Sequence, residues 1–308
     1  MRILIELPTW LGDAVMVSPA IENLANFQNE VEITLIGSFA SIEVFKNHQK
    51  VIKTVVLDKK YLSLVKISRE LGSFDAFFSF RKSFRAKFLK LLISANNKHQ
   101  FKKFKYPNRH QVEKYNDFVN EILGTNFPAR KLVLQGINST LSTHNLKLGI
   151  NPGASYGIAK RWYPDEFAQV AAELSEKYDI FIFGSLGEVD IANDIEKSLI
   201  EKGVTNYQNL AGKTTIPELI NQISRLDLFI TGDSGPMHIA ATFQIPTVAI
   251  FGPTNHDETS QWMNEKSMIV KKNLECQPCM QRTCPLKHHN CMKMVVASDV
   301  LRAVKTFN

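Results

Sequence analysis

A segment in the C-terminal half of the chain has the residue types of an anion-binding site. It reads Thr-Gly-Asp-Ser-Gly-Pro-Met-His over residues 231–238, directly after a run of apolar residues. Ser234 stands at the expected N-cap of a following helix, with Pro236 just inside it. Backbone N–H groups and the dipole at a helix N-terminus attract phosphate, and small residues let a ligand approach the backbone. The same pattern suits an ordinary capped helix with His238 in the core, and the residues alone do not decide.

A second glycine-containing loop, residues 151–162, also has groups that suit phosphate. It contains Ser155, Lys160 and Arg161 beside two glycines, and a lysine on such a loop neutralises a phosphate as a point charge. Its spacing fits neither G-x-G-x-x-G nor G-x-x-x-x-G-K-[ST], so neither a nicotinamide or flavin cofactor nor a P-loop nucleotide site is indicated.

A carboxylate follows the first apolar run of the chain. Gly12 and Asp13 stand in the loop after residues 3–5, where a carboxylate at a strand end can act as a general base. An aspartate in a strand-to-helix loop is also a common N-cap, and this alternative stays open.

The cysteines of the chain are clustered near its C-terminus. All four lie within sixteen residues, together with His288 and His289. Thiolates at such spacing can bind zinc, but the gaps do not match a paired C-x-x-C site. We expect reduced, packed thiols with no catalytic role, and a structural zinc site is the alternative. The four residues are Cys276, Cys279, Cys284 and Cys291.

Positive charge is concentrated in one segment. The chain has a net charge of +7, yet residues 81–110 hold ten basic residues and no acid. This excess is greater than solubility requires and favours an anionic partner: nucleic acid, an anionic membrane or a phosphorylated substrate. A solvated helix face is the alternative. The candidate binding residues are Arg81, Lys82, Arg85, Lys102, Lys103 and Lys105, and we expect Phe84, Phe88 and Phe104 to insert shallowly into a membrane.

The elements that must position these residues alternate between strands and helices. Strands are expected at residues 3–5, 31–36, 51–57, 76–80, 148–150, 180–183, 227–231 and 247–251, and the intervening segments are mostly helical. Such alternation predicts parallel, doubly wound sheets. Both halves begin as strand, glycine-containing loop and helix, and residues 136–147 form the best linker.

The length of 308 residues suits two domains, which we place at residues 1–140 and 141–308. We predict an α/β fold of two Rossmann-like domains with a ligand-binding cleft between them, and a last helix that packs back on the N-terminal domain. With 44% hydrophobic and 22% charged residues, the composition excludes global disorder. No apolar run is long enough for a transmembrane helix, and Glu6 and Asp13 interrupt the core that a signal peptide would need, so we expect a soluble cytoplasmic protein.

Several of these motifs recur together, in this order, in a known family. They are Gly12-Asp13, residues 151–153 with 160–162, Gly184-Ser185 with Glu188, and residues 210–214, 232–238 and 251–254. In this combination the chain resembles the ADP-heptose:lipopolysaccharide heptosyltransferases, which are glycosyltransferase family 9 enzymes of GT-B architecture. The cysteine-containing tail, residues 276–291, resembles the heptosyltransferase II branch.

The resemblance implies roles for individual residues. Asp13 would be the catalytic base, and Lys160 would contact the diphosphate of the donor. No Asp-x-Asp triplet is present, which agrees with catalysis that needs neither a metal nor another cofactor. The residues implied in donor binding are Gly12, Ser155, Glu188, Thr214, Asp233, Ser234, Gly235, His238 and Thr254.

The resemblance also implies an inverting transfer of L-glycero-D-manno-heptose from ADP-heptose to the first heptose of the lipopolysaccharide or lipooligosaccharide inner core. The donor would bind to the C-terminal domain and the lipid A-linked acceptor to the N-terminal domain, at the cytoplasmic face of a bacterial inner membrane. We then expect an anionic membrane surface as a partner and no nucleic acid. The alternatives are another GT-B nucleotide-sugar transferase, or a non-catalytic binder of nucleic acid or anionic lipid.

Overall fold

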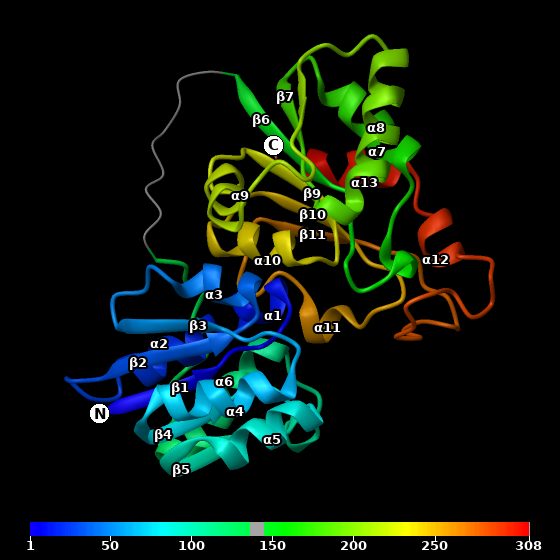
Figure 1. Cartoon of the computed structure of the whole chain (residues 1–308). Helices are drawn as coiled ribbons and strands as arrows, with labels where there is room; N and C mark the ends of the chain where they lie inside the picture. Colours follow the sequence, from blue (N-terminus) through cyan, green and yellow to red (C-terminus); the bar gives the residue numbers. More distant parts are fainter. Residues whose placement is uncertain (136–144, 308) are drawn as a thin grey trace. The chain divides into compact units, whose positions relative to one another are not determined.

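The computed structural model describes residues 1–135 and 145–307. The chain divides into two compact units, Met1–Ile137 and Asn138–Asn308, and each is built on one parallel sheet (Figure 1). The predicted α/β class with two doubly wound sheets is therefore confirmed. The predicted domain boundary between residues 140 and 141 lies outside the described residues, as does most of the predicted linker.

Unit 1 contains a five-stranded sheet in the order β3-β2-β1-β4-β5. Residues 3–5 of β1 are fully buried, as expected for a central parallel strand that is covered on both faces. In the register of β1 and β4, Glu6 pairs with Ser79, so both strands end at the same level. The strands are β1 (Arg2–Glu6), β2 (Glu32–Gly37), β3 (Val51–Val56), β4 (Ser73–Ser79) and β5 (Ser94–Gln100).

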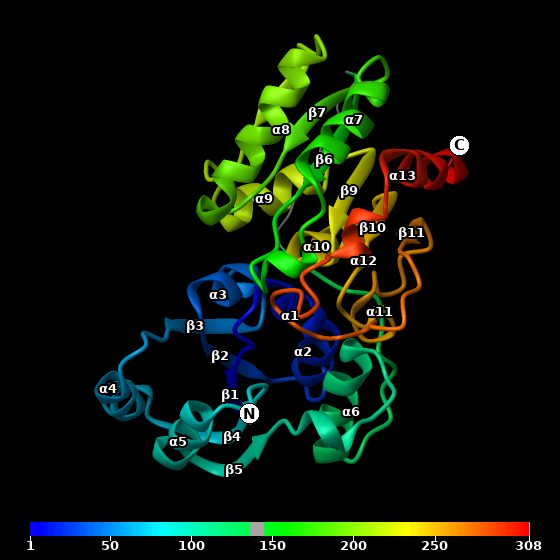
Figure 2. The same ribbon diagram turned by 90° about the vertical axis from the view of Figure 1, so that its right-hand side faces the viewer.

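Helices cover both faces of this sheet (Figure 2). On one face, Leu4 and Phe77 pack against Leu64 and Leu89 of two helices, α4 and α5. On the other face, Phe78 meets Phe118 of α6, with ring centroids 6.2 Å apart. The helices of unit 1 are α1 (Leu11–Met16), α2 (Ser18–Ala25), α3 (Phe39–Phe45), α4 (Tyr61–Leu71), α5 (Phe84–Leu92) and α6 (Gln111–Leu123).

Unit 2 contains a six-stranded sheet in the order β11-β10-β9-β6-β7-β8. Helices α7 (Pro164–Leu174) and α8 (Val189–Glu201) cover one face, and α9 (Ile216–Ile223) and α10 (Gly235–Thr242) lie on the other (Figures 1 and 2). The strands are β6 (Leu146–Asn151), β7 (Tyr178–Ile182), β8 (Tyr207–Asn209), β9 (Leu228–Gly232), β10 (Thr247–Ile250) and β11 (Ser267–Val270).

The last helix packs within unit 2. Helix α13 (Ala297–Val304) contacts α7 and β11, and Val300 and Val304 belong to the same hydrophobic core as the inner face of α7. Our expectation that the last helix also packs back on the N-terminal domain stays a prediction. None of the helices in the described part of the chain has the length and apolar character needed to cross a membrane.

The strand order in each sheet reverses at one point. In unit 1 the reversal lies between β1 and β4, and in unit 2 it lies between β6 and β9. Helices that follow two such neighbouring strands lie on opposite faces, which opens a crevice at the carboxyl ends of the strands where doubly wound sheets bind ligands. Asp13 follows β1 in helix α1, and Lys160 follows β6, so each predicted catalytic residue lies just after a strand at the reversal of its own sheet.

Candidate functional site

Three predicted site residues of unit 2 meet in one charged cluster. Lys160 Nζ lies 2.6 Å from Asp233 Oδ2, and the Thr254 hydroxyl donates to the same carboxylate oxygen at 2.7 Å. The side chains of Lys160 and Asp233 are 11% and 6% exposed. Because these residues come from the loops after β6, β9 and β10, the fold brings together groups that are far apart in sequence. The ion pair fixes the lysine ammonium at the reversal of the sheet.

Ser234 occupies the N-cap position of α10, as predicted, but its side chain does not cap the helix. Its hydroxyl lies 3.0 Å from the Thr231 hydroxyl and accepts from the Asn151 side-chain amide at 3.3 Å. Asn151 and Thr231 are register partners at the ends of β6 and β9. The hydroxyl therefore ties the two strand ends together and does not compete with an anion for backbone N–H groups at the helix start.

Glu188 has a structural position beside the same loop. Its Oε2 accepts from the backbone N–H of Ser185 at 2.7 Å and from the Ser185 hydroxyl at 2.8 Å. A Cβ atom at Gly153 would lie only 2.1 Å from Glu188 Cδ, so a glycine is required for this close approach. The carboxylate thus holds the turn between β7 and α8 against the loop that carries Lys160.

The remaining residues implied in donor binding lie on several elements. Gly235 and His238 are the first and fourth residues of α10, and His238 is buried. Ser155 is exposed and Thr214 is half-buried, each on its own loop. Gly12 belongs to unit 1, where it stands in the first turn of α1.

The predicted base, Asp13, lies in the first turn of α1 and is not its N-cap, which is Trp10. The positive end of the helix dipole favours a carboxylate at this position. The Tyr115 hydroxyl of α6 donates to Asp13 Oδ1 at 3.1 Å. Burial raises the pKa of the Tyr115 phenol well above its ordinary value, and the nearby Asp13 charge and the hydrogen bond raise it further. The phenol therefore stays protonated and remains a donor to Asp13 at neutral pH.

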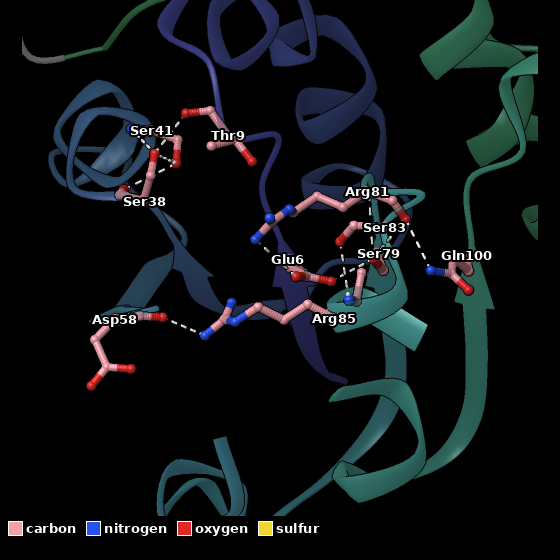
Figure 3. Close-up of polar contacts among 11 residues, drawn as sticks. Glu6, Thr9, Ser38, Ser41, Asp58, Ser79, Arg81, Ser83, Arg85 and Gln100 are labelled. Atoms are coloured by element: carbon pink, nitrogen blue, oxygen red, sulfur yellow. Dashed lines mark hydrogen bonds and ion pairs between the residues drawn. The ribbon is translucent and has the colours of Figure 1, made fainter. Parts of the chain in front are cut away.

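At the reversal of the unit 1 sheet, a buried acid holds the first residue of the basic segment (Figure 3). Glu6 is fully buried; it accepts from the Ser79 hydroxyl at 2.5 Å, and its Oε1 lies 3.4 Å from Arg81 Nη1. Burial raises the pKa of Glu6, while the Ser79 hydrogen bond and the charges of Arg81 and Arg85 oppose the shift. Arg85 donates to the backbone carbonyl of Asp58. The guanidinium groups of Arg81 and Arg85 are thus oriented by Glu6 and by the Asp58 carbonyl, respectively.

Acids outside the basic segment partly balance it, which corrects our expectation of ten unbalanced charges. Arg109 pairs with Glu113 and with Asp117 of α6, at 2.8 and 3.2 Å. Lys105 pairs with Glu121, and Arg81 pairs with Glu6. Lys82 and Lys102 are exposed, and Lys103 is half-buried. The segment therefore has less unpaired positive charge than the sequence suggests, because carboxylates of α6 pair with Lys105 and Arg109.

Two of the three phenylalanines expected to meet a membrane are exposed. Phe84 and Phe104 are 84% and 90% exposed. Lys87 Nζ lies 5.1 Å from the centre of the Phe84 ring, and Lys82 Nζ lies 5.7 Å from that of Phe104. Phe88, by contrast, packs edge-on against Tyr61 at 5.5 Å and joins the hydrophobic core. Phe88 is partly buried, so less of its ring is available to a membrane than of Phe84 or Phe104, and its insertion stays a prediction.

The four cysteines line one small hollow of about 20 Å³, together with His288 and His289. Burial raises the pKa of the Cys291 thiol to about 11, and the other three cysteines contribute to this shift. His289 is engaged by the Ala159 carbonyl at 2.9 Å and by the Tyr163 hydroxyl at 3.1 Å. In residues 1–135 and 145–307, no group of three or more His, Cys, Asp or Glu side chains is arranged to hold a metal ion. The choice between packed thiols and structural zinc stays a prediction.

Comparison with known proteins places these features in a family. The model of glycosyltransferase family 9 (heptosyltransferase) matches residues 77–290. The chain is 42% identical to lipooligosaccharide heptosyltransferase 2 of Campylobacter jejuni subsp. jejuni serotype O:2, over 99% of this chain and 98% of that protein.

The fold has close relatives among solved structures. E. coli ADP-heptose lps heptosyltransferase II superposes with a TM-score of 0.81 at 21% identity, covering 99% of this chain and 98% of that one. A glycosyltransferase family 9 protein of Veillonella parvula DSM 2008 gives 0.82 at 20% identity, covering 99% and 96%.

The chain belongs to glycosyltransferase family 9, the heptosyltransferases. It is a glycosyltransferase with the GT-B fold, so the predictions of family, fold and enzyme class are confirmed. The alternative of a non-catalytic binding protein is thereby set aside. Within the family, the chain is similar along its whole length to lipooligosaccharide heptosyltransferase 2.

The ion pair in unit 2 predicts a specific pattern of stability. Lys160→Met leaves the Asp233 charge buried without its cation and should lower the free energy of unfolding by about 3 kcal/mol. Adding Asp233→Asn removes that charge and should recover most of the loss. Urea unfolding of the two variants measures both effects. As a matched control, Lys46→Met breaks the more exposed pair with Glu43 and should cost less than about 1 kcal/mol; equal losses for both lysines would contradict the prediction.

Proposed function

We propose that the chain transfers L-glycero-D-manno-heptose from ADP-heptose to the first heptose of the lipopolysaccharide or lipooligosaccharide inner core, with inversion at the anomeric carbon. The observation that carries this proposal is the full-length similarity to lipooligosaccharide heptosyltransferase 2. The charged cluster of unit 2 and the carboxylate of unit 1 supply the two chemical functions that such a transfer requires.

The donor binds to unit 2 in this proposal, with its diphosphate at the charged cluster. A lysine ammonium has three N–H donors, so Lys160 can keep its bond to Asp233 and still donate to a phosphate oxygen. Helix α10 points its N-terminus to the same edge of the sheet, because it follows β9 directly. The backbone around Ser234 and Gly235 then adds the positive end of the helix dipole. The full donor set also includes Gly12, Ser155, Glu188, Thr214, His238 and Thr254.

The chemistry follows from the charges. Asp13 takes the proton of the acceptor hydroxyl while the oxygen attacks the anomeric carbon and the bond from that carbon to the diphosphate breaks. The transition state has oxocarbenium character, and ADP leaves with increased negative charge. Lys160 and the α10 N-terminus stabilise that charge, which is greater in the transition state than in the bound donor. We expect this mechanism to work without a metal or other cofactor.

The acceptor binds to unit 1 in this proposal. An inner-core acceptor linked to lipid A carries carboxylates and phosphates, which suit arginine because its planar N–H groups bind oxyanions in pairs. Arg81 and Arg85 lie at the reversal of the sheet and are already oriented by Glu6 and by the Asp58 carbonyl. The other proposed acceptor-binding residues of the basic segment are Lys82, Lys102, Lys103 and Lys105, of which Lys105 also pairs with Glu121.

The acceptor lipid also implies a membrane. We propose that the chain acts at the cytoplasmic face of a bacterial inner membrane, as a peripheral protein, and binds no nucleic acid. Phe84 and Phe104 are large, exposed rings beside lysines, a combination typical of surfaces that insert shallowly between anionic headgroups.

Replacing the proposed base tests the function directly. Asp13→Asn keeps the shape of the side chain and removes its basic carboxylate, so kcat should fall by about 10² to 10⁴-fold while ADP affinity stays near wild type. Acceptor-dependent ADP release and isothermal titration measure the two quantities. Asp75→Asn serves as the matched control, since Asp75 accepts from the Arg2 N–H at the opposite end of β1. Turnover of Asp13→Asn as fast as that of this control would refute the base assignment.

Removing the exposed rings tests the membrane surface. The double variant Phe84→Ser, Phe104→Ser should sediment about tenfold less strongly with vesicles that contain anionic lipid, because two apolar rings no longer leave water. Donor KM should not change, since the donor cluster lies in unit 2. Ile200→Ser is the control, because Ile200 is 60% exposed in unit 2. Equal sedimentation of the double variant, the control and the wild type would count against a membrane role for these rings.

A further inference from the structure

The base of unit 1 accepts a hydrogen bond from a buried phenol that no motif predicts. The Tyr115 hydroxyl of α6 donates to Asp13 Oδ1 at 3.1 Å. Tyr115 is 4% exposed. We propose that Tyr115 is a positioning residue that sets the orientation of the Asp13 carboxylate for proton abstraction. This inference rests on the proposed role of Asp13 as the base.

The phenol is fixed by its aromatic neighbours. The Tyr115 ring meets Phe80 edge-on, with centroids 5.5 Å apart at 87°, and meets Phe101 at 4.9 Å. Phe80 and Phe101 directly follow β4 and β5 and are 3% and 4% exposed. Because these rings come from two strand ends of the sheet, the hydroxyl has little freedom to leave Asp13. The position of the donor is therefore set by the core and not by a mobile loop.

Helix α6, which carries Tyr115, is hydrogen-bonded to α2, the helix that follows Asp13 and α1. A capping box between His110 and Glu113 fixes the start of α6. The Asn23 amide of α2 donates to the Asn116 oxygen at 2.6 Å, and α1 and α2 are separated only by Val17. Asn116, the residue after Tyr115, thus links α6 to α2. This bond restricts movement of α6 relative to the α1–α2 segment.

A phenol donor suits a carboxylate base in two ways. A hydrogen bond to the charged form favours that form, which must be present to accept a proton. It also restricts rotation of the carboxylate, and small errors in the orientation of a catalytic group cost large factors in rate. Since burial and the Asp13 charge raise the pKa of the phenol, Tyr115 does not ionise and cannot itself serve as the base.

Removing one oxygen atom tests the proposal. Tyr115→Phe keeps the ring packing and should lower kcat about tenfold, with unchanged KM for donor and acceptor and a melting temperature near wild type. The matched control is Tyr106→Phe. Tyr106 stacks on the same Phe101 ring and donates to a different carboxylate, Glu121, at 2.7 Å, so its loss should leave kcat unchanged.

A double-mutant cycle separates this proposal from the proposed function. If Tyr115 acts through the carboxylate, Tyr115→Phe should have no further effect on kcat in the Asp13→Asn background. A tenfold loss that persists in that background would overturn the proposal, as would wild-type kcat in Tyr115→Phe when Asp13→Asn is slow. Fast turnover of Asp13→Asn alone would instead refute the base assignment, on which this inference depends.

Discussion

The reversal of strand order in each parallel sheet is the constraint on which the rest of the structure depends. Strands on either side of the reversal send their helices to opposite faces, so the carboxyl ends of the strands face no covering helix. Glu6 and Ser79 end the two central strands of unit 1, and Asn151 and Thr231 have the same place in unit 2. The pair of Glu6 with Arg81 and the pair of Lys160 with Asp233 lie at or next to these strand ends.

Charges at such strand ends are partly removed from water, and the chain holds them in pairs. Glu6 faces Arg81 and Ser79, and Asp233 faces Lys160 and Thr254. A buried charge without a partner would be costly, and pairing also fixes the geometry of the cation. In the proposed function, each acid binds only some of the N–H groups of its arginine or lysine. The remaining N–H groups are available to an anionic substrate. Asp13 also accepts a hydrogen bond from the neutral phenol of Tyr115, which stabilises its carboxylate form.

The sequence predicts the fold and the positions of the glycine-containing loops well, because apolar strands and such loops are local signals. The catalytic roles of residues on these loops stay predictions. It does not predict β5, whose polar residues 94–100 form a strand at the sheet edge without an apolar pattern. The pairing of Lys105 with Glu121 and the bond from Tyr115 to Asp13 were also missed. Each joins residues far apart in the chain, the second across 102 positions, and only tertiary packing brings them together. For Ser234, the sequence predicted the N-cap position correctly but not the hydrogen bond of its hydroxyl with Asn151.

Mass spectrometry of the acceptor tests the central claim most directly. The purified chain is incubated with an inner-core acceptor that carries one heptose, and ADP-heptose is compared with UDP- and GDP-linked sugars as donor. The account predicts that the acceptor gains the mass of one heptose residue with ADP-heptose only, and that one ADP is released for each heptose transferred. An unmodified acceptor in the presence of ADP-heptose, or an equal gain of sugar from a UDP- or GDP-linked donor, would contradict it.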